Sequence, residues 1–344
     1  LSVQPSLNNI KKEFIPKWCI YIILLIFIHT QLLTNNYNIN KNLDIACNYC
    51  NKIIRGEYFI QKGKNYHQDC YHENIQLKCD FCKKTISGEY NIDNKNNYHV
   101  ACFRNNILEK CGACNLALEG EFIIDHWGNK YHESHTKETS NCESCNRLIC
   151  DAITNGGYLL NGTREICNIC WDELITDYTD IGTILSDVKS RLIRVGVYPF
   201  PKEIPITLVD TREQLEQYSN ISNNELNGYT KYSVEKIGGI TVSKEFEIFI
   251  LSNLHEMIFN AVLAHELMHV YLFHNEINLP SEKLEGFCNL GTKLIYENYN
   301  NEFSKIKLNA MYQNQNPHYG KGFVLMDSIL QQKGWKKLLQ DLVE

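Results

Sequence analysis

The sequence contains no dense run of lysine and arginine. Its 34 basic residues are outnumbered by 40 acidic ones, which gives a formal net charge of −6. Because a nucleic-acid-binding surface needs concentrated positive charge, this balance argues against a nucleic-acid partner. The 344 residues suffice for two or three domains, and a hydrophobic content of 44% is ordinary for a chain with a buried core.

A hydrophobic run long enough to cross a membrane is also lacking. The apolar segment WCIYIILLIFI, from Trp18 to Ile28, is short, and lysines precede it. Such a segment is typical of a secretory signal. With the following HTQLL it approaches the roughly 20 residues of a membrane span, and no small-x-small cleavage site follows. We expect residues 1–40 to form a signal, or an anchor through residues 18–33; an isolated buried helix is the alternative.

Cysteine, by contrast, is abundant, with 15 residues, and its spacing repeats. Cys-x-x-Cys pairs begin at Cys47, Cys79, Cys111 and Cys142, so the period is 32, 32 and 31 residues. A repeat of this length indicates one structural unit used several times. Each unit offers four candidate metal ligands: Cys47, Cys50, His67 and Cys70; Cys79, Cys82, His99 and Cys102; Cys111, Cys114, His132 and His135; Cys142, Cys145, Cys167 and Cys170.

Zinc explains these positions better than disulfides do. Disulfides would not require a histidine at the third ligand position of three copies, nor at the fourth position of one. Sulfur and nitrogen ligands in a tetrahedron suit zinc, and a site filled by four protein ligands is structural. We therefore predict four structural zinc ions. Only Cys19, Cys150 and Cys288 are left over.

The segments between the ligand pairs read as short hairpin strands. GEYFI, GEYNI and GEFII place aromatic and β-branched residues after a turn glycine. Modules this small need the metal for much of their folding energy. They resemble LIM domains, in which two zinc modules pack in tandem, here 47–102 and 111–170. The gaps between modules are longer than in LIM domains. The resemblance implies binding to other proteins.

The zinc pattern stops after Trp171. The residues 172–197 have helical periodicity, and 204–210 and 237–243 read as strands. The next apolar stretch contains His265-Glu266-x-x-His269. On a helix the two histidines lie on one face and can bind one metal, while Glu266 can reach a water on it. Because this helix is apolar around most of its circumference, it should be buried, and a metal would satisfy these polar groups together.

A catalytic zinc site usually has three protein ligands and one open position. The segment LPSEKLEGFCNLGTKLIY supplies the third ligand, with Ser281 as the expected N-cap of a second helix. We favour Glu285 over Glu282, because Glu285 lies in the apolar part of the helix, where an unpaired carboxylate is costly. Asn289 follows one turn later and could orient a ligand histidine.

Four segments then occur in the order GITVS, AHELMHVYL, LEGFCNL and PHYGKGF. Together they resemble the peptidase domain of the DA-one family, LIM-domain zinc peptidases of plants with bacterial relatives. The resemblance covers roughly residues 45–344. The family has two acids before the Gly-x-Cys; here Leu284 takes the first place and Glu285 the second, which supports Glu285 as ligand. No acidic helix with an Ala-x-x-x-Ser core is present, so the ubiquitin-linked regulation of the plant members is not implied.

The expected fold class is α+β: small zinc-ribbon or LIM-like modules over 41–172, then a mainly helical, gluzincin-like HExxH peptidase domain over 173–344. A fifth, catalytic zinc would lower the pKa of its bound water towards about 7. Glu266 would take the proton from that water and pass it to the leaving amine of a protein substrate. Tyr319, in the HYGKG loop, is the candidate that stabilises the oxyanion, with His318 next; the alternative is that Tyr319 packs a turn.

A second hypothesis is a catalytically inactive scaffold that acts through its LIM-like modules. The intact His265, Glu266 and His269 argue against it, because an inactive site has no need of Glu266. Five zinc ions per chain would fit the peptidase and four the scaffold. The N-terminal run favours a membrane-associated or exported protein, whereas twelve zinc thiolates favour a reducing, cytoplasmic location.

Overall fold

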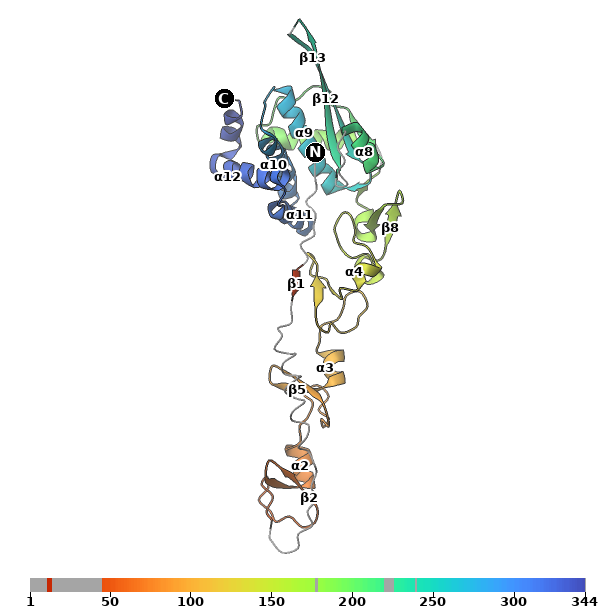
Figure 1. The fold of residues 1–344 in the computed structure, drawn as a ribbon, viewed down its shortest axis with the longest axis vertical. Helices are drawn as coiled ribbons and strands as arrows, with labels where there is room; N and C mark the ends of the chain where they lie inside the picture. Colours follow the sequence, from red (N-terminus) through yellow and green to blue (C-terminus); the bar gives the residue numbers. More distant parts are fainter. Residues whose placement is uncertain (1–10, 14–44, 177–178, 220–225, 239, 344) are drawn as a thin grey trace. The chain divides into compact units, whose positions relative to one another are not determined.

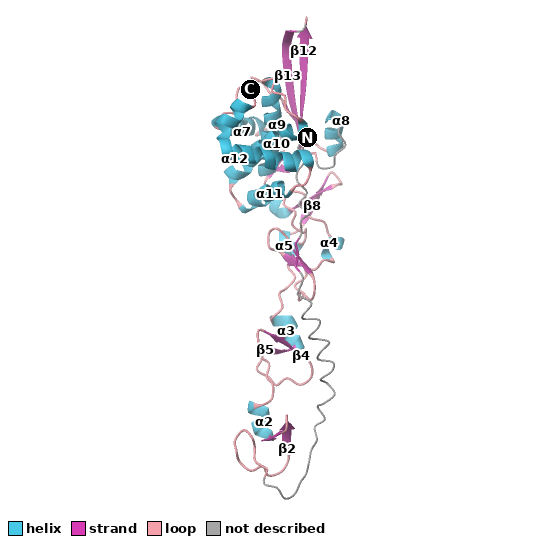
Figure 2. Cartoon of the chain, turned by 60° about the vertical axis from the view of Figure 1, so that its left-hand side comes forward, coloured by secondary structure: helices cyan, strands magenta, loops and turns pink. Residues whose placement is uncertain are grey.

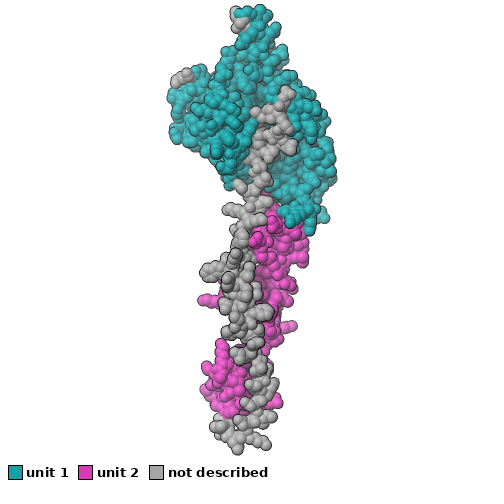
Figure 3. Space-filling model, in the orientation of Figure 1, with its two compact units in different colours: residues 1–10, 136–344 teal, residues 11–135 magenta. Residues whose placement is uncertain are grey.

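The computed structural model describes residues 11–13, 45–176, 179–219, 226–238 and 240–343. They fall into two compact units (Figure 3). Residues 11–135, the first unit in chain order, are drawn in magenta as unit 2, and residues 136–344, the second in chain order, are drawn in teal as unit 1. The segment 18–33, expected to be an anchor, lies outside the described residues. Among the described residues, no helix combines the length and the hydrophobicity that a membrane span requires.

The first unit consists of small antiparallel hairpins, each followed by a short helix (Figure 1). The strands expected in GEYFI, GEYNI and GEFII are confirmed, since each provides the first strand of a hairpin. A short strand near the N-terminus, β1, pairs with β6. The elements are β1 Lys11–Glu13, β2 Tyr58–Gln61, β3 Lys64–His67, α2 Gln68–Asn74, β4 Tyr90–Asp93, β5 Asn96–His99, α3 Val100–Asn106, β6 Phe122–Ile124, β7 Lys130–Tyr131 and α4 His135–Glu138.

The Cys-x-x-Cys turns share one backbone geometry in all four modules. The residue after the second cysteine has a positive φ, and its N–H donates to the carbonyl of the first cysteine at 2.8 Å. Asparagine tolerates this left-handed conformation better than most residues, and it holds the position in three modules. These residues are Asn51, Lys83, Asn115 and Asn146. The turn brings the two thiols of each pair to the same side.

Each of these modules has very little apolar core. In the second module the buried residues are Cys79, Ile86 and Tyr98, with a few half-buried neighbours. The first cysteine of the ligand set is thus itself part of the core. Such a small core cannot offset the chain entropy lost on folding, so the modules depend on a bound metal.

The second unit begins with the fourth zinc module and continues into a helical region. The module contains α5 Asp151–Thr154, the hairpin of β8 Gly157–Leu160 and β9 Arg164–Cys167, and α6 Asn168–Trp171. This module therefore belongs to the same compact unit as the helical region. The domain boundary between residues 172 and 173 stays a prediction.

The helical region contains a three-stranded sheet, in the order β11-β13-β12, in which β11 runs parallel to β13 and β12 runs antiparallel to it. The far part of the β12–β13 hairpin extends beyond the helices of this unit (Figure 2). The elements are β10 Leu174–Ile175, α7 Ile181–Arg194, β11 Ile206–Val209, α8 Arg212–Ser219, β12 Gly228–Ile237, β13 Ile240–Leu251, β14 Leu254–His255, α9 Glu256–His274, α10 Ser281–Tyr299, α11 Glu302–Gln313, the π-helix η1 Pro317–Lys321 and α12 Gly322–Asp341.

Helix α9 is the centre of this core, as its all-round apolar sequence predicts. Every residue from Met257 to Leu272 is buried. Helix α10 packs closely against it because Gly291 has no side chain: a Cβ there would lie 2.8 Å from Cγ of Met268 and 3.0 Å from the carbonyl oxygen of Ala264. This approach brings the His-Glu-x-x-His face of α9 next to the start of α10.

Four details differ from the expectations. The helix expected over 172–197 begins only at Ile181, because Leu174 and Ile175 pair with β14 instead. Ser281 is the first helical residue and Pro280 is the N-cap, without a side-chain bond. The HYGKG segment forms the π-helix η1 and not a loop. The strand expected over 237–243 is divided, since Ile237 ends β12 and Ile240 begins β13, the middle strand of the sheet.

Candidate metal centres

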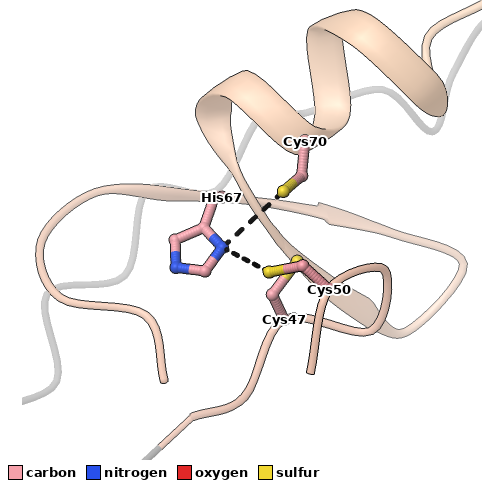
Figure 4. Close-up of side chains that lie close together, drawn as sticks. All are labelled: Cys47, Cys50, His67 and Cys70. Carbon is pink, nitrogen blue, oxygen red and sulfur yellow. Dashed lines mark hydrogen bonds between the residues drawn. The ribbon is translucent and has the colours of Figure 1, made fainter. Parts of the chain in front are cut away.

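The first module brings its four predicted ligands together (Figure 4). His67 Nδ1 lies 3.4 Å from Sγ of Cys50 and 3.8 Å from Sγ of Cys70. Cys47 and Cys50 come from the tight turn, His67 ends β3, and Cys70 lies in the first turn of α2. Each further module brings its own four predicted ligands together in the same way. The structure therefore gathers all sixteen predicted ligands into four groups.

These spacings match zinc coordination. With bonds of about 2.0–2.1 Å to nitrogen and about 2.3 Å to sulfur, tetrahedral edges are about 3.6 Å from nitrogen to sulfur and about 3.8 Å between sulfurs. The second module repeats 3.4 and 3.8 Å, from His99 to Cys82 and Cys102. In the fourth, Sγ of Cys145 and Cys167 are 3.7 Å apart. All four groups are therefore tetrahedral-like sets that could bind zinc, as LIM-like modules do.

The ligand histidines are also oriented for this role. In each of the first three modules Nδ1 faces the thiols while Nε2 lies near a backbone carbonyl oxygen, at 3.2, 2.9 and 3.1 Å for His67, His99 and His132. A second hydrogen bond of this kind fixes the ring and its tautomer.

Without a cation the four donors of a module are in electrostatic conflict. The pKa of Cys47 falls to about 6 although burial acts against this, because the backbone N–H groups of Cys50 and His67 bond its thiolate. Burial and the thiolates of Cys50 and Cys47 then raise the pKa of Cys70 to about 11. A zinc ion held by these residues would remove the conflict, because it would bind all the thiolates at once.

A fifth group of candidate ligands lies between α9 and α10. His265 and His269 approach each other through their Nε2 atoms, 3.2 Å apart. Oε2 of Glu285 lies 3.4 Å from Nε2 of His265 and 3.7 Å from Nε2 of His269. The edge of a zinc tetrahedron between nitrogen or oxygen donors is about 3.4 Å. The three predicted ligands thus have the spacing of one face of a tetrahedron.

The chemistry of these donors fits a divalent cation. Burial lowers the pKa of His269 to about 4, so its ring is neutral and can bind a metal at pH 7. Burial alone would raise the pKa of Glu285, but the rings of His269 and His265 outweigh it and hold the pKa at about 2. Oε2 of Glu285 is buried and has no hydrogen-bond partner within the described residues. A zinc ion would satisfy it.

A second layer of contacts holds the site. Oδ1 of Asn289 lies 3.0 Å from Nδ1 of His265, the contact that was predicted. The amide of Asn289 donates to the carbonyl oxygen of Tyr319 at 3.0 Å. Tyr319 therefore lies beside the site, and burial together with the charges of Glu285 and Glu266 raises the pKa of its phenol. The phenol stays protonated at neutral pH.

Glu266 is fully buried and is held by β12. Its Oε2 accepts a hydrogen bond from Oγ1 of Thr230 at 2.8 Å, while Oε1 is without a hydrogen-bond partner in the described part of the chain. The backbone of Gly228 approaches so closely that a Cβ there would lie 2.9 Å from Oε1. Thr230 and Gly228 were missed in the sequence, since a strand partner of Glu266 leaves no local signal.

Cys288, one of the leftover cysteines, also reaches this group. Its Sγ lies within 4.8 Å of the ring nitrogens of His265 and His269. Burial raises the pKa of its thiol well above the usual value, so without a metal the thiol is protonated. The position three residues after Glu285 on α10 was the available signal, because residues so spaced share a helix face.

The comparisons agree with this arrangement at a coarse level. No protein-family model matches the chain. It is distantly similar to Protein DA1-related 2 of Arabidopsis thaliana. The two are 27% identical over 198 residues, which cover 47% of this chain and 36% of that protein. The match therefore spans little more than a third of the length of this curated relative. The zinc-binding, LIM-like modules and this distant similarity support the family resemblance seen in the sequence.

Proposed function

We propose that this chain is a zinc-dependent peptidase that hydrolyses protein or peptide substrates. The observation that carries the proposal is the convergence of His265, His269 and Glu285 at tetrahedral spacing beside the free oxygen of Glu266. Three protein ligands leave one position open, as catalytic zinc sites do. The LIM-like modules, expected within 41–172, would precede a peptidase domain over 173–344.

The residues around the site would have different roles in the reaction. Zinc, when bound, supplies a Lewis acid that activates water and polarises the scissile carbonyl. Thr230 holds one oxygen of Glu266, which leaves Oε1 to take a proton from the attacking water and to return it to the leaving amine. The protonated phenol of Tyr319 is our candidate donor to the developing oxyanion.

The substrate would bind as an extended strand. Strand β12 is an edge strand of its sheet and contacts the site through Thr230. A peptide that adds to a sheet edge gains main-chain hydrogen bonds in a fixed register. Such binding would present one peptide bond to Glu266.

The LIM-like modules would recruit other proteins. The first two expose an aromatic side chain at the same place in the Cys-x-x-Cys turn, Tyr49 at 52% and Phe81 at 50%. Exposed aromatic residues are enriched in the cores of protein interfaces.

The decisive test is Glu266→Gln in the full chain. We expect it to keep all bound zinc and to lose at least about 100-fold in the hydrolysis of unfolded casein, because a general base contributes about 10²–10⁴-fold. Glu256→Gln is the matched control, since Glu256 lies on the same helix and accepts a hydrogen bond from Tyr299 away from the site. Full activity in Glu266→Gln would exclude the proposed mechanism.

One observation favours the scaffold instead. If the thiolate of Cys288 joined the two histidines and Glu285, four protein ligands would close the site, and such zinc sites are structural. The wild-type protein would then bind five zinc ions and hydrolyse no peptide. Binding of only four zinc ions would also favour the scaffold, with no metal at the fifth site.

A further inference from the structure

The fourth zinc module differs from the other three in its surroundings. All four of its thiols are buried, whereas each of the first three modules has half-buried or exposed ligands. It belongs to the same compact unit as α9 and α10. Three of its contacts with the rest of that unit lead to elements of the fifth site.

The first route runs through Arg164, which lies on β9 three residues before the ligand Cys167. Its side chain is 3% exposed. The guanidinium donates to the carbonyl oxygens of Ser252 at 2.8 Å and Asn253 at 3.1 Å, and to both oxygens of Glu143 at 3.1 Å. Ser252 and Asn253 form the bend directly before β14 and α9. Arg164 thus ties the module to the start of the helix that carries His265.

The second route is the chain itself. Three residues after the ligand Cys170, the carbonyl oxygen of Glu173 accepts from the N–H of Glu256, the first residue of α9, at 2.7 Å. β10 then pairs with β14. The carboxylate of Glu173 lies 3.0 Å from Nε2 of His255, the residue that caps α9. The N-terminus of α9 is therefore bonded to the segment that leaves the zinc site.

The third route reaches Glu266. Glu143 lies between the ligands Cys142 and Cys145, and its two oxygens accept from Arg212 at 3.1 and 3.0 Å. Arg212 also donates to Oδ1 of Asn227 at 2.9 Å. Asn227 directly precedes β12, whose Gly228 and Thr230 contact Glu266.

We propose that the fourth zinc site positions the fifth, and that Glu143 and Arg164 are the positioning residues through which it acts. Glu143 has a fixed place only while Cys142 and Cys145 are held by one metal. When that zinc leaves, Glu143 and Arg164 lose their place, and the buried charges are left without partners, which is costly. The starts of α9 and β12 then loosen together, and the donors of the fifth site separate. The role of the fifth site in this inference rests on the proposed function, but the coupling between the two metal sites does not.

Zinc content tests the coupling without any substrate. In the full chain, Cys170→Ser should lose two zinc ions, the fourth and the fifth, when the purified protein is measured by plasma mass spectrometry. Cys70→Ser, the equivalent change in the first module, should lose one. Loss of a single zinc from Cys170→Ser would overturn the proposal.

A second variant covers the case in which Cys170→Ser fails to fold. Arg164→Lys keeps the charge and all sixteen thiol and imidazole ligands of the modules but loses the forked hydrogen bonds. We expect it to retain five zinc ions and to release the fifth to a chelator at least tenfold faster than wild type. The phase of the fifth zinc is identified as the one that Glu285→Gln abolishes. Arg104→Lys, which alters the exposed pair with Glu119, is the control and should change nothing.

Kinetics separate positioning from simple loss of fold. If the chain is a peptidase, Arg164→Lys should lower kcat with little change in KM. Its far-ultraviolet circular dichroism spectrum should equal that of wild type. An unchanged release rate of the fifth zinc would refute the coupling, whether or not the chain hydrolyses peptides. Conversely, a fully inactive wild type with the expected release rates would refute the peptidase and leave the coupling intact.

Discussion

At the scale of single residues, the identity of the third ligand decides what the fifth site can do. Oε2 of Glu285 is 3.4 and 3.7 Å from the two ring nitrogens, whereas Sγ of Cys288 is only within 4.8 Å of them. The carboxylate also has the lower pKa, and it stays ionised when buried because the histidines face it. Both distance and charge therefore favour Glu285.

Paired substitutions test this choice. We expect Glu285→Gln to bind four zinc ions after dialysis against a weak chelator, because an amide is a poorer zinc ligand than a carboxylate. Cys288→Ser should keep five and should remain as active as wild type. The opposite pattern, with zinc lost from Cys288→Ser and kept in Glu285→Gln, would make the cysteine the ligand.

The close approach of Gly228 to Glu266 gives a second test at this scale. A Cβ in Gly228→Ala would lie 2.6 Å from Cγ1 of Val262 and 2.9 Å from Oε1 of Glu266, so a side chain must shift. Overpacking of this kind costs about 1–3 kcal/mol, and here it also displaces the proposed general base. We expect a lower melting temperature. We also expect a loss of peptidase activity that is larger than the loss of folded protein explains.

Gly182→Ala is the matched control for that experiment. Gly182 lies in α7 with open space around its Cα, so an alanine there meets nothing. A helix gains about 0.5–1 kcal/mol from this exchange. If Gly228→Ala were as stable and as active as Gly182→Ala, strand β12 would not hold Glu266 in place.

At the scale of elements, regular patterns were predictable and long-range partners were not. The hairpins follow from glycine, aromatic and β-branched residues, and the apolar sequence of α9 predicts its burial on all sides. The predictions for the cap of α10 and for Pro317–Lys321, which forms a π-helix, were wrong. The geometry of the π-helix depends on a neighbouring segment, since a Cβ at Gly320 would lie 1.8 Å from the carbonyl oxygen of Asn314.

The start of α9 predicts a pH dependence of stability. His255 accepts from the N–H of Met257 as N-cap, and burial, followed by the charge of Lys307, lowers its pKa to about 4. The carboxylate of Glu173, 3.0 Å from Nε2, acts in the opposite direction, but it is largely exposed to solvent. In the unfolded chain a histidine has a pKa of about 6.5. The unfolded state therefore binds the proton more readily, and folding stability falls as the pH drops from about 6.5 to about 4.

His255→Asn isolates this contribution, because asparagine can cap the helix but does not titrate. As the pH falls across that window, the free energy of unfolding of the variant should rise relative to that of wild type. The difference should be at most about 3 kcal/mol, at about 1.4 kcal/mol per pKa unit. Denaturant unfolding at several pH values measures it. Parallel pH profiles for the two proteins would show that the histidine is accessible to protons in the folded state.

At the scale of the whole molecule, the two units differ in how much metal sites and apolar cores contribute to their stability. The sequence predicted the four sets of zinc ligands, because their spacing is local. It did not predict that the fourth module shares a unit with α9, because Arg164 and Glu143 meet Ser252, Asn253 and Arg212 across long stretches of chain. The first three modules lack such support within residues 45–135, where each core holds a few residues only.

The four modules should therefore lose zinc in a definite order. A chelator must reach a ligand atom, and Cys114 is exposed while Cys50, Cys70, Cys82 and Cys102 are half-buried. All four cysteines of the fourth module are buried. We expect ethylenediaminetetraacetate with iodoacetamide to alkylate the cysteines between Cys47 and Cys114 well before Cys142, Cys145, Cys167 and Cys170, as resolved by peptide mass spectrometry.

Cys150 provides the internal reference, because it is half-buried in the fourth module but belongs to no metal group among the described residues. Its alkylation should be independent of the chelator until the fourth zinc leaves. Simultaneous labelling of Cys70 and Cys170 would mean that burial in the helical unit does not protect the fourth site. Earlier labelling of the first three modules would instead show that the second unit keeps its zinc because its apolar core holds the module in place.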